Sequence, residues 1–289
     1  MDLSRDFIKA KRPCTDGFRW FLRTHREGGD YQPLLDALVS EGRINDACWL
    51  LDQFGPTDAV LHLDSLEATA IVFAGSIEVR GNIEVDTLIR AGRSIIAGGG
   101  VRSNGGIVAG EDLRAGGNIR CAEALAVGGD VRAGWGIEVD GMLSCSGDLR
   151  VEWDVQCRGE LQVDGNMQIG QDLFCSAASR CGKGLNVAGD IHCAGDLKVS
   201  NGIQAGGDIR GAGHIEAGRG IRARGDIEAR GAIKAGESLY SEAAIRAGTG
   251  YGVYAGLIVQ LDAWEASAQV IARARPERLM SGCWLAPDF

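Results

Sequence analysis

The sequence predicts an all-β solenoid, a single-stranded parallel β-helix with triangular coils of about 18 residues. Three observations predict this fold. The 192 residues from Thr69 to Gln260 divide into thirty-two hexads without an insertion or deletion. Residues of one kind recur 18 positions apart. Glycine is abundant, at 44 residues, yet no proline occurs between Pro56 and Pro276. The absence of proline is expected where every strand donates hydrogen bonds to a neighbour.

The hexads have a consistent chemistry. Their third position is Ile, Leu, Val or Met in thirty cases, and Ser179 and Tyr251 are the exceptions. The fifth position is Ala, Val or Cys in twenty-seven cases. Because side chains alternate along a strand, these two positions face the core and the mostly charged fourth position faces water. Gly, Asp, Asn and Ser at the first two positions supply the corner. Three hexads then close one coil, and the repeat gives ten to eleven coils.

Ladders at a spacing of 18 support three sides per coil. The tryptophans Trp135 and Trp153 are one such pair. Longer ladders are formed by Cys157, Cys175 and Cys193, by Asp154, Asp172, Asp190, Asp208 and Asp226, and by Asp112, Asp130 and Asp148 with Arg114, Arg132 and Arg150. We expect each ladder to run along one corner or face of the rod.

The two ends lack the hexads. Residues 1–60 show helical periodicity, with helices expected from Thr15-Asp16 to Leu22, around Leu34 to Val39, and from Ala47 to Phe54. We therefore expect a helical module at 1–60, the β-helix at 61–260, and a cap at 261–289. Within that cap, Leu261 to Ala274 is amphipathic and is expected to be helical. Such elements would cover the unpaired strands at the ends of the solenoid.

Composition excludes several functions. The net charge of −9 argues against a nucleic-acid binder and favours a cationic partner. The sequence shows neither a signal peptide nor an apolar run long enough for a membrane span, so we expect a cytoplasmic protein without a membrane contact. Six of the nine cysteines fall at the fifth hexad position, where a thiol behaves as a small buried hydrophobe. Without a CxxC pair we expect no metal, and a reducing compartment suits free thiols.

Catalytic chemistry is also unsupported. The sequence shows no Ser/His/Asp grouping, no phosphate-binding fingerprint and no paired-carboxylate site, so we expect no enzyme, no catalytic residue and no cofactor. The ladder from Asp154 to Asp226 could bind calcium, but hydrogen bonds from each carboxylate to local backbone N–H groups explain one Asp per corner more simply.

The candidate binding residues are aromatic. Trp135 and Trp153 occupy the usual glycine position, and Phe174 occupies a usually charged position one coil further on. We expect the rings to project outward as one cluster with an acidic rim, which is the composition of a surface for a basic protein. The alternative is that they pack against a terminal module folded back along the rod. The rim residues are Glu138, Asp140, Glu152, Asp154 and Asp172.

Hexads such as Gly-Asp-Leu-Arg-Val-Glu from Gly147 resemble the β-helical core of bactofilins, polymer-forming bacterial cytoskeletal proteins, over about two thirds of the chain. This resemblance implies a structural scaffold. The left-handed hexapeptide acyltransferases have a similar coil size, but their motif fits poorly, and we therefore favour a right-handed coil. As an acidic rod in which no catalytic residues are expected, the chain resembles bacterial toxin-immunity proteins, including those of type VI secretion.

These considerations give a leading hypothesis. The chain is expected to be a monomeric immunity protein that occludes a basic toxin, for example a nuclease, through the aromatic face. A bactofilin-like scaffold that forms filaments is the alternative, and an acyltransferase is a weaker third hypothesis.

Overall fold

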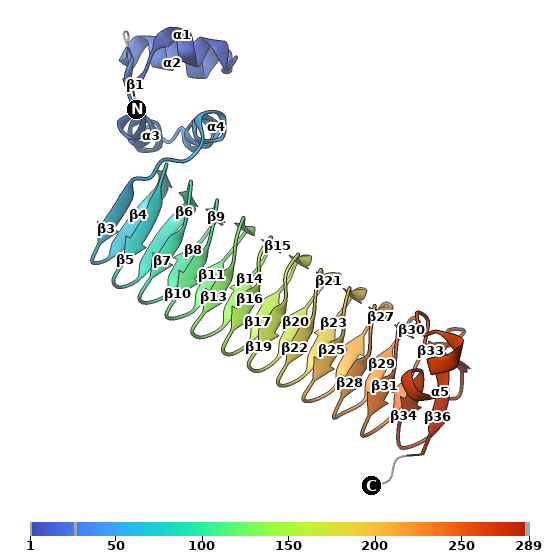
Figure 1. Cartoon of the computed structure of the whole chain (residues 1–289). Coiled ribbons are helices and arrows are strands. Elements are labelled where there is room, and N and C mark those ends of the chain that lie inside the picture. The colour runs from blue at the N-terminus through green and yellow to red at the C-terminus, as the bar shows by residue number, and fades with distance from the viewer. Residues whose placement is uncertain (1, 26–27, 287–289) are drawn as a thin grey trace.

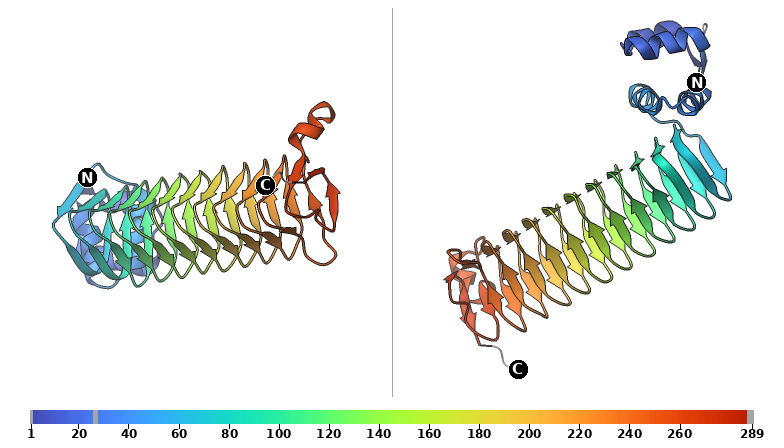
Figure 2. Two further views of the ribbon diagram at one scale, coloured as in Figure 1. Left: turned by 90° about the horizontal axis from the view of Figure 1, so that it is seen from below. Right: turned by 180° about the vertical axis from the view of Figure 1, so that it is seen from behind.

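A computed structural model, which describes residues 2–25 and 28–286, shows a straight parallel β-solenoid with a helical module at its N-terminal end (Figure 1). The module contains α1 (Arg5–Ala10), α2 (Thr15–Thr24), α3 (Tyr31–Ser40) and α4 (Ile44–Phe54), and β1 (Asp2–Leu3) pairs with β2 (Gly29–Asp30) in antiparallel fashion. Two views from other sides show that the helices stay at this end and leave the length of the rod uncovered (Figure 2).

The solenoid has three faces. Face 1 consists of β3 (Val60–Leu63), β5 (Ser76–Val79), β7 (Ile95–Ala97), β10 (Leu113–Ala115), β13 (Val131–Ala133), β16 (Leu149–Val151), β19 (Met167–Ile169), β22 (Leu185–Val187), β25 (Ile203–Ala205), β28 (Ile221–Ala223), β31 (Leu239–Ser241), β34 (Gln269–Ile271) and β36 (Cys283–Leu285).

Face 2 consists of β8 (Val101–Ser103), β11 (Ile119–Cys121), β14 (Ile137–Val139), β17 (Val155–Cys157), β20 (Leu173–Cys175), β23 (Ile191–Cys193), β26 (Ile209–Gly211), β29 (Ile227–Ala229) and β32 (Ile245–Arg246). Face 3 consists of β9 (Gly106–Ala109), β12 (Leu125–Val127), β15 (Leu143–Cys145), β18 (Leu161–Val163), β21 (Ser179–Cys181), β24 (Leu197–Val199), β27 (Ile215–Ala217), β30 (Ile233–Ala235), β33 (Val253–Tyr254) and β35 (Leu279–Ser281). The longer β4 (Leu66–Phe73) and β6 (Ile83–Ala91) continue from face 2 into face 3.

The strand register confirms the three-sided coil. Over most of the rod, paired residues are 18 apart, as where Leu113 lies opposite Val131 and Ile209 lies opposite Ile227. Face 1 nevertheless carries thirteen strands, so the expected ten to eleven coils were too few. The reason is that strands begin at Val60 and continue to Leu285, beyond both ends of the hexad stretch.

The hexad pattern is wrong near its C-terminal end. Ile233 lies opposite Val253, which is 20 residues later rather than 18. A turn closed by the N–H of Tyr251 and the carbonyl of Gly248 accommodates the two extra residues, and Gly250 in this turn has a φ of +88°. Because of this shift Leu257, an inward residue in the hexad frame, is 52% exposed.

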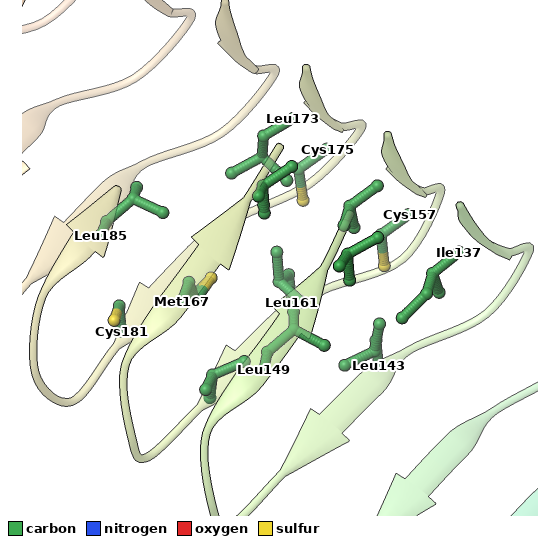
Figure 3. Close-up of a cluster of buried hydrophobic side chains, with 14 of the residues drawn as sticks. Ile137, Leu143, Leu149, Cys157, Leu161, Met167, Leu173, Cys175, Cys181 and Leu185 are labelled. Carbon is green, nitrogen blue, oxygen red and sulfur yellow. The ribbon is translucent and has the colours of Figure 1, made fainter. Parts of the chain in front are cut away.

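The core is built from the third and fifth hexad positions, as predicted. Aliphatic residues stack on aliphatic residues along each face, and Figure 3 shows this stacking around Leu143, Leu161 and Leu173. The six cysteines at the fifth position are buried and free, and Cys157 and Cys175 stack in the same figure. The expectation that these cysteines fill the core is confirmed.

The buried thiols also satisfy backbone carbonyls. The Sγ of Cys145 lies 3.1 Å from the carbonyl oxygen of Gly129, in the corner of the preceding coil. Cys193 makes the same contact with Ala177, at 3.0 Å. Burial raises the pKa of the Cys145 thiol to about 11, so the thiol keeps its proton and can donate it to the carbonyl at neutral pH.

The corner aspartates bond to the next coil rather than locally, which corrects the sequence-based expectation. The Oδ1 of Asp190 accepts the backbone N–H of Asp208, and that of Asp208 accepts the N–H of Asp226, both at 2.7 Å. A parallel ladder at the corner between faces 3 and 1 runs from Asp112 through Asp148. Each carboxylate therefore links one coil to the next where the chain turns away from the strand ladder.

The helical module covers the first coils, and α3 supplies the key contact. The side-chain amide of Gln32 donates to the carbonyl of Val72 at 3.1 Å and accepts the N–H of Ala74 at 2.9 Å. This amide satisfies backbone groups of the first coil as a neighbouring strand would. An ion pair between Asp52 of α4 and Arg90 adds a second attachment. Within the module, the N-cap of α2 is Cys14 rather than the expected Thr15-Asp16.

The C-terminal segment is less helical than expected. Residues 261–263 form the short helix η1 (Leu261–Ala263), which leads into α5 (Trp264–Ser267). The expected helix through Ala274 is wrong beyond Ser267, because Gln269 to Ile271 forms β34 instead. Val270 and Ala272 are buried there as part of the solenoid core. Among the described helices, none is long and apolar enough to cross a membrane.

One buried position predicts a stabilising substitution. Ser179 lies between Leu161 and Leu197 in the face 3 ladder, and its buried hydroxyl has no hydrogen-bond partner among the described residues. Ser179→Ala should raise the free energy of unfolding by about 1 kcal/mol, because it removes an unsatisfied buried hydroxyl. Chemical denaturation measures this change. The matched control is Ser241→Ala, whose hydroxyl donates to Gly225 at 2.8 Å and whose loss should destabilise the protein.

A second prediction concerns acid stability. The Oδ1 of Asp148 accepts the backbone N–H of Asn166 at 2.7 Å, and this bond lowers the pKa of the Asp148 carboxyl. The stabilisation is therefore present above about pH 4, the range of the unfolded pKa, and is lost as the pH falls through the lower folded pKa. Asp148→Ala should be less stable than wild type at pH 7, and the difference should shrink in stronger acid. Denaturation midpoints across this pH range measure it, and a constant difference would contradict the expectation.

Candidate functional site

The tryptophan corner, defined as Trp135 and Trp153, lies where face 1 turns into face 2. Trp135 stands between β13 and β14, and Trp153 stands one coil later between β16 and β17. The indole centroids are 5.9 Å apart and the ring planes differ by 14°. The rings are 57% and 54% exposed, respectively. The structure therefore places two stacked, exposed rings on the outside of the rod, whereas the helical module lies at the N-terminal end (Figure 2).

The two rings form a ridge, because most other coils have glycine at this corner. The same corner position is Gly99 and Gly117 in the two preceding coils, Gln171 in the following coil, and Gly189 and Gly207 further on. At Gly207 a Cβ would lie 1.9 Å from the Oδ1 of Asp190, which explains the glycine there. The tryptophans, followed by the exposed Gln171, therefore rise above a corner that is glycine in the coils on either side. A depression of about 240 Å³ beside the ridge is lined by Asn118, Arg120, Gly136, Glu138, Asp154 and Gln156 along with the rings.

Two residues of the predicted rim are neutralised by arginines. Glu138, on β14, forms an ion pair with Arg120. Asp140 forms one with Arg158 at 2.9 Å. Asp140 also lies at the far corner, between faces 2 and 3, because β14 separates it from Trp135. The structure therefore does not gather Asp140 at the tryptophan corner.

The other three acids lie at the corner itself. Glu152 precedes Trp153, is exposed and forms no ion pair with any described residue. Asp154 and Asp172 belong to the corner ladder, in which Asp154 accepts the N–H of Asp172 at 3.0 Å and Asp172 accepts the next N–H at 2.7 Å. These three carboxylates give the corner its negative charge.

Phe174 belongs to a different surface. It lies on β20 in the middle of face 2 and stacks on His192 of the next coil, with centroids 5.3 Å apart and ring planes that differ by 8°. The two rings line a depression of about 630 Å³ together with Arg210, Glu228 and Arg246. The expectation of one aromatic cluster is therefore replaced by two pairs of rings. The spacing of 18 between Phe174 and His192 was the signal that could have revealed the second pair.

The described residues contain no cluster of metal-ligating side chains. Outside the masked positions, no group of three or more His, Cys, Asp or Glu side chains could hold a metal ion. His214 accepts the backbone N–H of Ala232 at 2.9 Å through Nδ1, so it takes the place of an aspartate in a corner ladder. The arrangement at the tryptophan corner can bury apolar surface and attract positive charge.

Comparison with known proteins is informative only for the N-terminal module. Residues 1–54 match the family model described as the YdhT N-terminal domain. These residues form α1 to α4 and enclose an apolar cavity of about 400 Å³ lined by Trp20, Phe21, Leu38 and Trp49 among others. No curated protein and no solved structure matched the chain. The chain therefore contains a module similar to the YdhT N-terminal domain, joined to a parallel β-solenoid.

Proposed function

We propose that the chain is a non-enzymatic, protein-binding β-solenoid that acts as an immunity protein in the bacterial cytoplasm. The supporting observation is the exposed stack of Trp135 and Trp153. Large exposed aromatic rings contribute little to folding, whereas they are the residues that contribute most at protein interfaces. The three acids beside the rings make a basic protein, such as a nuclease toxin, the fitting partner.

Binding would proceed in two stages. The net charge of −9 and the carboxylates of Glu152, Asp154 and Asp172 would attract a basic toxin and orient it toward the corner. Burial of both indoles would then hold it. Because Asp154 bonds to the next coil and the backbone N–H of Glu152 donates to the carbonyl of Ala133 at 3.2 Å, the backbone on either side of Trp153 is held in place before the partner arrives. The rod would inhibit by covering the toxin's cationic surface.

The test uses the product of a neighbouring toxin gene co-expressed with this protein. Trp153→Asp should weaken co-purification and abolish protection of the cell, because a charged carboxylate replaces the apolar ring. Met142→Asp is the matched control, since Met142 is also partly exposed, in the same coil as Trp135 but at the corner between faces 2 and 3. Equal binding by wild type and Trp153→Asp would exclude the tryptophan corner as the binding surface.

A second candidate function, end-to-end assembly as in a scaffold, is favoured by the C-terminal end. Within the described residues, no strand pairs with the outer edges of β35 and β36. Met280, Trp284 and Leu285 are exposed there. Unpaired strands with apolar side chains favour pairing with another chain. At the other end α3 and α4 contact β4, but the outer edge of β3 also pairs with no described strand, and Val60 is exposed there.

End-to-end assembly through the unpaired edges predicts oligomers that lengthen as the protein concentration rises. Sedimentation at rising protein concentration should show this growth, and Met280→Lys should prevent it because it places a charge at the edge. Phe7→Lys, an exposed position on α1, is the control. A single copy at all concentrations would contradict the expectation.

A further inference from the structure

Face 1 carries a groove in its C-terminal half. The groove crosses β19 to β31, has a volume of about 670 Å³, and lies between the central row of outward side chains and the corner where face 3 turns into face 1. Its floor at that corner is formed by Gly184, Gly202 and Gly220. In earlier coils the same position is filled by Asp112, Asp130 and Asp148. The replacement of aspartate by glycine therefore opens the groove.

The central row beside the groove is made of amides. Gln168, Asn186 and Gln204 lie opposite one another in successive coils and are exposed. Their side chains make no hydrogen bond to any described residue. A carboxamide both donates and accepts, so three of them at the coil spacing of roughly 4.8 Å present a repeating set of donors and acceptors.

The row continues with an arginine that lacks its usual partner. Upstream, Arg114 pairs with Asp112 at 2.8 Å, and Arg132 pairs with Asp130 at 3.3 Å. In each case the carboxylate precedes the arginine by two residues. Arg222 has Gly220 at that place and forms no ion pair within residues 2–25 and 28–286. It lies instead with its guanidinium carbon 4.7 Å from the ring centroid of Tyr240.

Other cations lie along the two corners of face 1. Lys183 and Arg219 occupy the corner beside the glycine floor, and Arg224 lies at the opposite corner, where it lines a second depression of about 480 Å³. None of the three forms an ion pair with a described residue. From Ile96 to Tyr240 the central row of face 1 contains no carboxylate. An acidic protein therefore has a face along which amides and unpaired cations predominate.

The exposed amides and cations of face 1 indicate which class of ligand would bind there. Unpaired amides match hydroxyl groups, which also donate and accept. Unpaired guanidinium and ammonium groups match carboxylates. A single-stranded nucleic acid would need exposed rings on which bases stack, but the ring in this groove, Tyr240, already has Arg222 over one face. A ladder of equivalent groups also suits a ligand whose own groups repeat.

We propose that the groove on face 1 binds an acidic oligosaccharide, a chain of hydroxylated rings that carry carboxylates. The amides of Gln168, Asn186 and Gln204 hold hydroxyl groups, and Arg222, with Arg219 and Arg224 near it, holds a carboxylate. This site is separate from the tryptophan corner and does not depend on the function proposed for it.

Titration calorimetry with oligogalacturonate tests the proposal. Wild type should bind it, and cello-oligosaccharide of equal length should bind at least about tenfold more weakly, because it lacks the carboxylates. Arg222→Gln should lose about tenfold in affinity for oligogalacturonate. Arg132→Gln is the matched control, since Arg132 has the same place in an upstream coil but is paired with Asp130.

A gain-of-charge variant makes the test sharper. Gly220→Asp would restore the upstream pairing to Arg222 and fill the floor, so it should abolish binding. Its Cβ would lie 3.2 Å from the carbonyl oxygen of Ser238, which requires only a small adjustment. Trp153→Asp should bind oligogalacturonate as wild type does. Absence of binding to oligogalacturonate, equal affinity for cello-oligosaccharide, or binding to oligo(dT) alone would each overturn the proposal. Should Gly220→Asp fail to fold, Arg222→Gln still decides, because Arg222 is exposed.

Discussion

The structure depends on one constraint: each coil must repeat the register of the coil before it. A strand of three residues has no stability alone, and its backbone groups are satisfied only by strands 18 residues away on either side. Since side chains alternate with period two, a change of one residue in a corner would turn the following inward residues toward water. The coil length of 18 residues over most of the rod therefore follows from the need to keep the aliphatic ladders inside.

This constraint separates the positions that can vary from those that cannot. The third and fifth hexad positions are fixed by the core, and backbone hydrogen bonds to adjacent coils fix the path of the strands. The fourth position and the corners remain open to change. Both binding surfaces inferred for this chain arise there: tryptophan in place of glycine raises a ridge, and glycine in place of aspartate opens a groove.

The sequence predicted the solenoid well because residues 18 positions apart in the sequence lie opposite one another in adjacent strands. The prediction failed at the C-terminal end of the hexad stretch, where residues outside the repeat matched the pattern by chance. Leu257 fits the hexad frame, but the turn around Gly250 shifts the chain by two residues, so Val253 pairs with Ile233 and Ala255 is the next buried residue. The segment after Leu261 was predicted wrongly because Leu261, Trp264, Ala268 and Ile271 have the spacing of one helix face. The buried residues are instead Val270 and Ala272, which follow the two-residue period of a strand.

The sequence predicted which site residues stack on one another at a spacing of 18 along the rod. It did not predict which of these stacks lie next to each other around the coil. A spacing of 18 placed Trp153 on Trp135 correctly, whereas it could not show that a strand separates the tryptophans from Asp140. Nor does a list of charges show which are paired: Glu138 and Asp140 are neutralised by Arg120 and Arg158, while Arg222 has no carboxylate beside it. Recognition by such a rod therefore depends less on its net charge of −9 than on the places where a charged side chain has no opposite charge beside it.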